Sequence, residues 1–369
     1  MLHDADIIEY GYSLGFSIIG AASAEPFFNE KKILKARLSA EELSEEKLLP
    51  RIYPHLTLPG AKTIIAVGLS YNLPFPEKPA DLPRGRLARF ACLPDYHSVL
   101  RNKMTALGDF LAQKISGLKY KCQVDQGPLL DRAVAFRAGL GFWGKNNCLI
   151  NPRFGSFVFL GEILIDQYCE PSSPVLAKRK NCQGCEKCIK TCPTGALSPN
   201  YLDKSLCLSA ISQSKGFIPI PLRKAMGDRL YGCDTCQEVC PHNHGKPLLK
   251  AKEFIEHEFD PFPELLPLIN LTKSAFKARF FHTALYWRGF KVLRRNAIIV
   301  AGNTHCQEAL PSLERLLNHD NDRETRQYAA WAIGKIGGIN AKTILEKALK
   351  AETMYEVKEE IGIALGNLA

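Results

Sequence analysis

The chain has 369 residues, of which 46% are hydrophobic and 23% are charged, and its formal net charge is +10. This length favours two or three domains over a single core, and the composition excludes a disordered or fibrous protein. No apolar run approaches the roughly 20 residues that a membrane-spanning helix needs, so we expect no membrane association.

The first 170 residues predict a mixed α/β domain. Residues 15–24 (GFSIIGAASA) have the apolar character of a signal peptide, but acidic residues precede them where positive charge is required, so we expect a helix that leads into a strand. The segments TIIAVGLSYN (63–72) and FGSFVFLGEILID (154–166) are rich in β-branched and aromatic residues and predict strands. Between them, residues 95–115 carry apolar side chains at helical spacing and predict a helix.

A linker and a cysteine-rich segment follow. Residues 168–181 contain proline, serine and a basic end, as interdomain linkers often do. Of the thirteen cysteines, nine fall between Cys169 and Cys240. Such clustering in a long chain without an export signal favours metal binding in a reducing cytoplasm over a disulfide scaffold. We therefore predict a cytoplasmic, metal-binding protein.

The segment CQGCEKCIKTCP, from Cys182 onward, has the cysteine spacing of half a two-cluster ferredoxin. Short C-x2-C-x2-C loops supply three thiolates to one 4Fe–4S cluster, and a fourth cysteine before a proline serves the other cluster. Cys182, Cys185 and Cys188 are thus predicted to bind cluster one, and Cys192 to bind cluster two. Zinc is the alternative, but zinc ribbons use paired C-x2-C units and fit this density poorly.

The second half, YGCDTCQEVCP, is an altered copy of the first. By the symmetry of the two halves, Cys240 is predicted to complete cluster one, while Cys233 and Cys236 bind cluster two. Leu230 stands where a ferredoxin has a further cysteine. Cys207 is the only other cysteine between the halves, so we assign it to cluster two. The residues between Cys207 and Cys233 are expected to lie against that cluster.

The region after residue 260 begins with a proline-rich connector (260–272) and then carries charge of one sign. No acidic residue lies between Glu264 and Glu308, whereas basic and aromatic residues are interleaved there. Such a stretch should attract a polyanion such as nucleic acid; the alternative is a solvated helical face with core aromatics. The predicted nucleic-acid contacts are Lys273, Lys277, Arg279, Arg288, Lys291, Arg294 and Arg295.

The C-terminal residues contain a repeat. Three segments each begin with a basic residue, continue with apolar residues and reach a glycine at the same position. These glycines, Gly302, Gly334 and Gly366, keep a strict spacing of 32 residues. The period predicts stacked helix pairs of the HEAT type, each of which buries its apolar face only against its neighbours; chance similarity among amphipathic helices is the alternative.

Three motifs, in a fixed order, carry a resemblance to a known family. They are RFACLPDYH (89–97), VDQGPLLDRAVAFRAGLGFWGKNN (124–147) and the two-cluster segment with its displaced Cys207. Together they closely resemble the epoxyqueuosine reductase family over essentially the whole chain. The AGLG-x-x-GKN signature at 138–146 is shared with the cobalamin-dependent reductive dehalogenases.

The resemblance implies an α+β multidomain fold. Residues 1–170 would form a nitroreductase-like α/β domain that binds cobalamin. Residues 171–248 would form a ferredoxin-like domain with two 4Fe–4S clusters, and residues 260–369 a HEAT-like domain of α-helical repeats. Cofactor contacts are expected at Cys92, Lys145, Asn146, Ser209 and Ser214. For Lys145 and Asn146 the alternative is an ordinary surface loop.

The implied activity is reduction of epoxyqueuosine to queuosine at the wobble position of tRNA, with electrons passing through two clusters to cobalamin. Conversion of an epoxide to an alkene takes two electrons and two protons and releases water, so an acid must protonate the departing oxygen. The resemblance gives this role to Asp125, which burial would suit to the task by raising its pKa; the alternative is a turn-capping aspartate. Two positions depart from the family pattern: Asp131 replaces a glutamate before Arg132, and Pro94 replaces a glycine.

The partners implied are tRNA and an external one-electron donor, with the enzyme acting as a monomer. Two other classes of function are considered. A reductive dehalogenase acting on a small molecule would have no need of a basic helical array. An iron–sulfur electron-transfer protein would have no need of the first 170 residues and their motifs.

Overall fold

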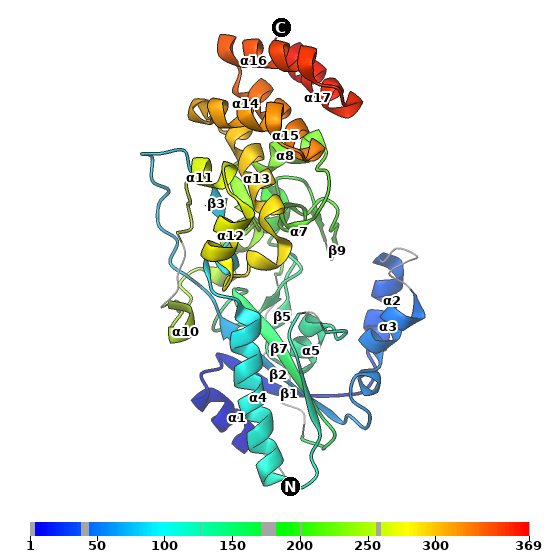
Figure 1. Ribbon diagram of the computed structural model, residues 1–369. Helices are drawn as coiled ribbons and strands as arrows, with labels where there is room; N and C mark the ends of the chain where they lie inside the picture. The colour runs from blue at the N-terminus through cyan, green and yellow to red at the C-terminus, as the bar shows by residue number, and fades with distance from the viewer. Residues whose placement is uncertain are drawn as a thin grey trace.

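A computed structural model of the protein describes residues 4–37, 44–125, 127–170, 182–199, 201–255 and 260–368. The molecule is elongated (Figure 1): a sheet with its helices lies at the N-terminal end, the cysteine-rich segment lies in the middle, and stacked helices form the C-terminal end. None of the helices in these ranges combines the length and the apolar character needed to cross a bilayer.

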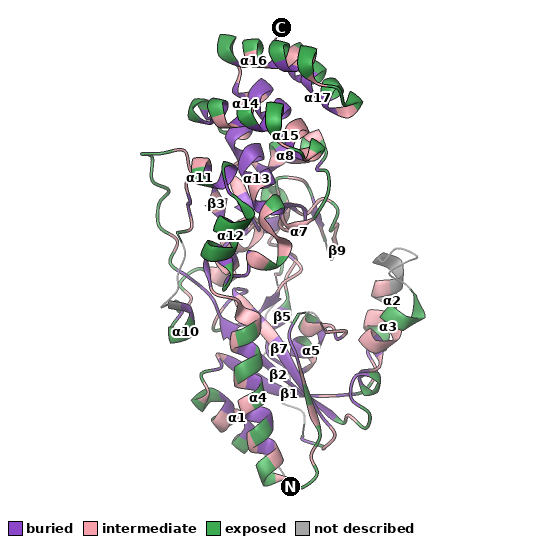
Figure 2. Cartoon of the chain, viewed as in Figure 1, coloured by how far each residue is buried: buried purple, intermediate pink, exposed green. Residues whose placement is uncertain are grey.

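The N-terminal part is built on one antiparallel sheet. Its strands are β1 (Ile18–Ser23), β2 (Thr63–Ser70), β7 (Val158–Ile165) and β4 (Tyr120–Gln123), hydrogen-bonded in that order. The strands predicted in 63–72 and 154–166, and the strand predicted after an N-terminal helix, are confirmed. Every residue of β2 is buried (Figure 2), because helices cover both faces of the sheet.

The alternation of side chains along β2 separates its two faces. The helices that flank the sheet are α1 (Asp4–Ser13), α4 (Tyr96–Lys114) and α5 (Asp131–Arg137). Ile65 and Val67 belong to the apolar cluster of α1 and α4, whereas Ile64 and Ala66 belong to that of α5. Helix α4 confirms the predicted helix, and Asp95 caps it by accepting a hydrogen bond from the His97 N–H.

Shorter elements complete the N-terminal part. They are α2 (Phe28–Arg37), α3 (Glu45–Ile52), β3 (Arg86–Leu87), β5 (Phe142–Trp143), β6 (Leu149–Ile150) and two 3-10 turns, η1 (Pro54–Leu56) and η2 (Arg89–Cys92). Strands β5 and β6 pair as a small hairpin whose turn contains the GKN end of the AGLG-x-x-GKN motif.

The cysteine-rich segment consists of short helices and turns. They are α6 (Lys187–Thr191), β8 (Leu197–Ser198), β9 (Tyr201–Leu202), α7 (Leu208–Gln213), α8 (Ile220–Met226), β10 (Arg229–Tyr231), α9 (Thr235–Glu238), η4 (Pro241–Asn243) and α10 (Lys252–Ile255). Strand β10 pairs in parallel with β3 of the N-terminal part. The domain boundaries stay a prediction, and most of the linker predicted at 168–181 lies outside the described residues.

The predicted connector at 260–272 contains structure of its own. The Leu87 N–H donates to the Pro261 carbonyl and the Leu265 N–H to the Pro83 carbonyl, both at 2.9 Å. The helices from here to the C-terminal end are α11 (Leu265–Ile269), α12 (Lys273–Phe280), η5 (Tyr286–Arg288), α13 (Phe290–Asn303), η6 (Gln307–Ala309), α14 (Leu310–His319), α15 (Arg323–Ile336), α16 (Gly338–Ala351) and α17 (Tyr355–Gly366). Helix α15 packs against both α13 and α17, so the repeated segments stack as predicted.

The repeated glycine is the point of closest approach between successive helices of the stack. A Cβ atom on Gly302 would lie 2.8 Å from Trp331 Cζ3 and 2.9 Å from Ala332 Cα, and one on Gly334 would lie 2.6 Å from Ala364 Cβ. A Cβ atom on Gly366 would meet nothing within 4 Å. Two of the three glycines are therefore required by packing between helices.

Gly334→Ala is expected to lower the free energy of unfolding by about 1–3 kcal/mol, because the added methyl group forces α15 away from α17. Gly366→Ala is the matched control: it makes the same change in the same register but in open space, and should be close to neutral. Urea unfolding of both variants measures the difference. Equal losses in the two variants would contradict the packing role.

Two members of the predicted nucleic-acid surface serve the fold instead. Arg295 is 7% exposed, and its guanidinium donates to the Gly216 carbonyl at 2.8 Å. Arg294 forms an ion pair with Asp320 at 3.0 Å. The prediction that these two arginines contact nucleic acid is therefore corrected: carbonyl and carboxylate groups within the protein already occupy their side chains. Next to them, the buried Asn296 amide donates to the carbonyls of residues 212 and 230, both at 2.7 Å.

Candidate active site

Two adjoining cavities lie between the sheet and the cysteine-rich segment. Their volumes are about 1150 Å³ and about 950 Å³. Both are lined by Asp125, Arg132, Asn147, Lys204 and Gln213, so they form one continuous space. Together they exceed the roughly 300–1,000 Å³ of a pocket for an ordinary small molecule. The space therefore suits a large cofactor together with a substrate.

Asp125 stands at the junction of the two cavities. It follows β4 with a φ of 54°, a left-handed conformation that is uncommon for a residue other than glycine. Its Oδ2 accepts a hydrogen bond from the Tyr96 hydroxyl, and His97 Nε2 lies 3.8 Å from the same oxygen. The side chain is 56% exposed, so the burial anticipated from the sequence is not present around it. The arrangement presents the carboxyl group to the cavity.

The hydrogen bonds around Asp125 depend on the pKa values of Tyr96 and Asp95. Burial, followed by the charge of Asp125, raises the pKa of Tyr96, so Tyr96 stays a hydrogen-bond donor at neutral pH. The hydrogen bond from His97 lowers the pKa of Asp95, and His97 Nδ1 lies 2.7 Å from Asp95 Oδ1. Tyr96 therefore orients Asp125, while Asp95 orients His97.

Asn146 is a buried residue with an unused donor. Its side chain is 4% exposed and lines the larger cavity. The Oδ1 atom accepts from the Cys148 N–H at 3.2 Å, whereas Nδ2 has no partner among the described residues. Leaving a buried N–H group without an acceptor costs about 1–3 kcal/mol, which a bound ligand would recover. Asn146 thus fits a polar cofactor such as cobalamin.

Lys145 lies on the same turn but contacts a different group. Its backbone N–H donates to Cys182 Sγ at 3.3 Å, in the predicted set for cluster one. The contribution of Lys145 in the structure is therefore a hydrogen bond from its backbone N–H to a thiol, and its side chain has no part in that bond. The AGLG-x-x-GKN turn links the cavity, through Asn146, to the cysteines of cluster one, through Lys145.

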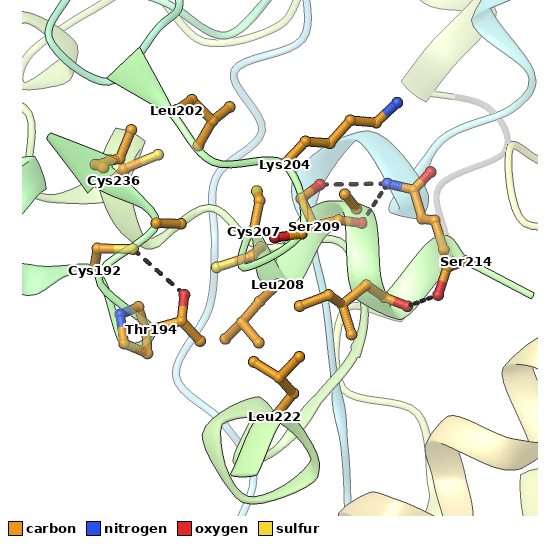
Figure 3. A pocket seen from close by; sticks show the side chains of 18 of the residues that line it. Cys192, Thr194, Leu202, Lys204, Cys207, Leu208, Ser209, Ser214, Leu222 and Cys236 are labelled. Carbon is orange, nitrogen blue, oxygen red and sulfur yellow. Dashed lines mark hydrogen bonds between the residues drawn. The ribbon is translucent and has the colours of Figure 1, made fainter. Parts of the chain in front are cut away.

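Ser209 and Ser214 line the larger cavity along α7 and at its end. Ser214 Oγ donates to the Ile211 carbonyl at 2.8 Å, and Gln213 Nε2 donates to the Ser209 carbonyl at 2.9 Å. Figure 3 shows Cys192 and Cys236 on one side of this cavity and Ser214 on the other, with Cys207 between them. The predicted cofactor serines and the predicted cluster-two cysteines thus border the same space.

Cys92 lies away from this space. It belongs to η2, its side chain is 1% exposed, and its Sγ donates to the Ala88 carbonyl at 3.4 Å. It packs within the apolar cluster of α1 and α4 and does not line either cavity. The predicted cofactor contact at Cys92 is therefore corrected to a core position.

The predicted cluster ligands fall into two electrostatic groups. Burial raises the pKa of Cys240, and the charges of Cys182 and Cys185 raise it further. Burial also raises the pKa of Cys188, and the charges of Cys182 and Cys240 add to that effect. Likewise burial and then the charges of Cys233 and Cys192 raise the pKa of Cys207.

The sets predicted from spacing stay a prediction, because Cys148 also acts on Cys236 and is itself influenced by Cys240 and Cys207. The first contains Cys182, Cys185, Cys188 and Cys240; the second contains Cys192, Cys207, Cys233 and Cys236. Within the described residues, no three His, Cys, Asp or Glu side chains converge as around a single ion. Four thiols in each set agree in number and type with the ligands of a 4Fe–4S cluster.

Sequence reasoning missed three residues of the site. Tyr96 orients Asp125, and the Arg132 guanidinium lines both cavities and donates to the Asn147 carbonyl. Glu162 is 1% exposed in the middle of β7. The sequence could have indicated Glu162, because it is the only acidic residue in an otherwise apolar strand.

Comparisons with known proteins cover the whole length of the chain. Residues 51–126 match the family model described as "Epoxyqueuosine reductase QueG, DUF1730". Residues 181–243 match the 4Fe-4S double cluster binding domain, and residues 284–366 match HEAT repeats. The predicted two-cluster segment and the predicted HEAT-like repeats are thereby confirmed, and with them the α+β multidomain fold.

Curated relatives carry one name. The chain is 41% identical to an epoxyqueuosine reductase of Bacillus subtilis over 373 residues, which span 96% of this chain and 93% of the relative. It is 32% identical to an epoxyqueuosine reductase of Escherichia coli, over 89% of this chain and 88% of the relative.

Solved structures agree with the curated relatives. An epoxyqueuosine reductase in complex with an epoxyqueuosine-modified tRNA-Tyr stem loop superposes with a TM-score of 0.89 at 39% identity, covering 99% of this chain and 98% of that one. The enzyme from Streptococcus thermophilus superposes with a TM-score of 0.87 at 31% identity, covering 98% of both chains.

Proposed function

Since the chain belongs to the epoxyqueuosine reductase family, we propose that its two adjoining cavities are where it acts on its substrate. The reaction is the reduction of epoxyqueuosine to queuosine in tRNA. The proposal depends on one observation: Asp125, the unpaired Asn146 side-chain N–H group and the cysteines predicted to bind cluster two all line the larger cavity. Neither a small-molecule dehalogenase nor an electron carrier accounts for a family match of this extent.

The cofactors of the protein are two 4Fe–4S clusters and cobalamin. The clusters supply electrons one at a time and the cobalamin brings the reducing centre to the substrate carbon. We assign Cys182, Cys185, Cys188 and Cys240 to cluster one, and Cys192, Cys207, Cys233 and Cys236 to cluster two. The second set borders the larger cavity, so it is the set placed to pass electrons to a cofactor bound there.

The chain offers polar contacts for the cobalamin in the larger cavity. Asn146 Nδ2 provides a free donor, and Ser209 and Ser214 line the same cavity. The Lys145 backbone N–H stabilises negative charge on the Cys182 sulfur. Asn146 and Lys145 are adjacent, so one turn positions both the cofactor and a cluster ligand.

Asp125 is the proton donor in this proposal. Its carboxyl group lines both cavities, so it reaches a substrate in one and faces a cofactor in the other. The hydrogen bond from Tyr96 fixes one carboxyl oxygen, which leaves the other to carry the proton to the departing epoxide oxygen. The strained backbone at Asp125 holds the side chain in this direction.

The tRNA approaches through the basic stretch in this proposal. Lys273, Lys277, Arg279 and Lys291 are exposed. Arg288 lines the larger cavity and, with Lys215 and Lys291, a further cavity of about 350 Å³. Within the predicted basic stretch, Arg288 is therefore the residue that reaches the larger cavity, and Lys291 lies beside it in the further cavity. A tRNA substrate also agrees with a cytoplasmic enzyme, and we propose that a monomer, reduced by an external one-electron donor, carries out the reaction.

Anaerobic enzyme carrying its cofactors should convert epoxyqueuosine in tRNA to queuosine, as nucleoside mass spectrometry detects.

Arg288→Gln combined with Lys291→Gln should raise the KM for tRNA and reduce the slope of log affinity against log salt by about 1–2, since each lost phosphate contact lowers it by roughly 0.7–0.9. Lys342→Gln combined with Lys347→Gln, on α16, is the charge-matched control. Absence of queuosine with the unmodified enzyme contradicts the function, whereas an unchanged slope contradicts only the surface.

A further inference from the structure

Glu162 is a buried carboxyl group beside the proton donor. It lies in the third strand of the sheet, directly opposite Ala66 of β2 and Gln123 of β4 in register. Neither neighbour provides a positive charge. The Glu162 Oε2 atom and the Gln123 Oε1 atom are both buried and without a hydrogen-bond partner. Among the described residues, Glu162 therefore has no cation or donor on the neighbouring strands that would stabilise its ionised form.

Asp131 joins Glu162 to the cavity. Its carboxyl group is hydrogen-bonded to that of Glu162, and it lines the smaller cavity together with Asp125. Two carboxyl groups in such a contact cannot both be ionised in a buried site. Asp131 and Glu162 therefore form a carboxyl pair that holds a proton, with one end buried in the sheet and the other facing the active site.

The charges that face the pair come from the loop after β4 and from α5. Burial is the largest cause of the raised pKa of Asp131, and repulsion by Asp125, on the loop after β4, is the next. For Glu162, burial comes first, then its interaction with Asp131, and then repulsion by Asp125. Arg132 on α5 acts in the opposite direction on Asp131. Burial and the charge of Asp125 bring the pKa of Asp131 to about 7. Asp131 thus carries a proton in part of the molecules at neutral pH and can release it.

The reaction needs more protons than Asp125 holds. Both carbon–oxygen bonds of the epoxide break, one carbon–carbon double bond forms, and the oxygen leaves as water. The external donor supplies two electrons, and two protons complete the water. Asp125 can give one proton before it must be recharged. A source of the second proton within the enclosed site would make the step independent of access to solvent.

We propose that Asp131, hydrogen-bonded to a protonated Glu162, passes its proton to Asp125 and so supplies the second proton of epoxide reduction. In this role Asp131 stores a proton and Glu162 is a positioning residue, and both act through Asp125. After the first transfer Asp125 is ionised, the Asp131 proton moves to Asp125, and Glu162 keeps its own proton and donates a hydrogen bond to the Asp131 carboxylate that remains. Solvent replaces that proton after product release. The inference rests on the proposed function of the site and deepens it.

Asp131→Asn should lower the single-turnover rate about tenfold or more, because no group beside Asp125 then holds the second proton. Glu162→Gln should move the alkaline limb of the rate–pH profile to higher pH, because the hydrogen bond from Glu162 lowers the pKa of Asp131 and a weaker amide donor replaces it. The KM for tRNA should not change in either variant. Asp131→Glu should restore most of the rate that Asp131→Asn loses.

A second readout does not depend on turnover. The holoenzyme at pH 7 should show an infrared carbonyl band of a protonated carboxylic acid that is missing from Glu162→Gln. Unmodified enzyme is measured alongside, so that failure to reduce the substrate at all counts against the proposed function. Normal turnover by the unmodified enzyme, together with an undiminished rate in Asp131→Asn or an unchanged infrared band in Glu162→Gln, would overturn the carboxyl pair as proton store.

Discussion

Asp125→Asn is expected to lose epoxide reduction by a factor of about 10² to 10⁴ while retaining its iron and its cobalamin. The amide cannot give up a proton to an oxygen, yet it keeps the size of the side chain and its acceptor for the Tyr96 hydroxyl. The loss should appear in the maximal rate rather than in the KM for tRNA, because in our proposal Asp125 acts on the reacting atoms and does not hold the tRNA.

The control for this variant is a second tyrosine–aspartate pair outside the site. Asp109 on α4 accepts a hydrogen bond from the Tyr120 hydroxyl at 2.5 Å, and neither residue lines the two cavities. Asp109→Asn should therefore leave the rate unchanged. Iron and corrinoid content, read from the visible spectrum, show whether the Asp125 variant is intact. Full turnover in an intact Asp125→Asn enzyme would remove Asp125 as proton donor.

Cys207→Ser is expected to lose about half of the iron and nearly all of the turnover. In our assignment Cys207 is the fourth thiolate of cluster two, and a serine hydroxyl is a poor ligand for iron that prefers thiolate. Cluster one keeps all four of its cysteines in this variant. Electrons would therefore enter the protein but would not reach the cavity that the second set borders.

A rival ligand makes the test of Cys207 sharper. Cys148 lies on the AGLG-x-x-GKN side of the cavity, and its charge raises the pKa of Cys236. If Cys148→Ser loses the iron while Cys207→Ser keeps it, the fourth ligand is Cys148 and our assignment is wrong. Cys306→Ser, a buried cysteine among the helical repeats, should retain all of the iron in either case.

Spacing along the chain was enough to predict features that depend on local order. The ligand sets follow from cysteines a few residues apart, and Cys207 follows from counting what one motif lacks. The glycines of the repeat were visible because stacked units impose the same close approach at a fixed interval. Strand β2 was visible because a strand buried on both faces is apolar throughout.

Side-chain environments that depend on distant segments could not be predicted in this way. Arg295 has the sequence context of a surface cation, but its partner is a carbonyl 79 residues away. The contact between Asp131 and Glu162 depends on which face of β7 meets α5, which only the sheet register decides. Cys92 sits beside a family motif, yet its neighbours in space are the core residues under α4.

The anchoring of the cluster-two excursion by Asn296 bears on how the protein is made. One side-chain amide on α13 holds the carbonyls of Ser212 and Leu230, within the segment that joins Cys207 to Cys233. A ribosome therefore exposes all eight cluster cysteines well before it delivers the residue that fixes the second set. The segment between Cys207 and Cys233 therefore reaches its final position only after α13 has been synthesised and has packed against it.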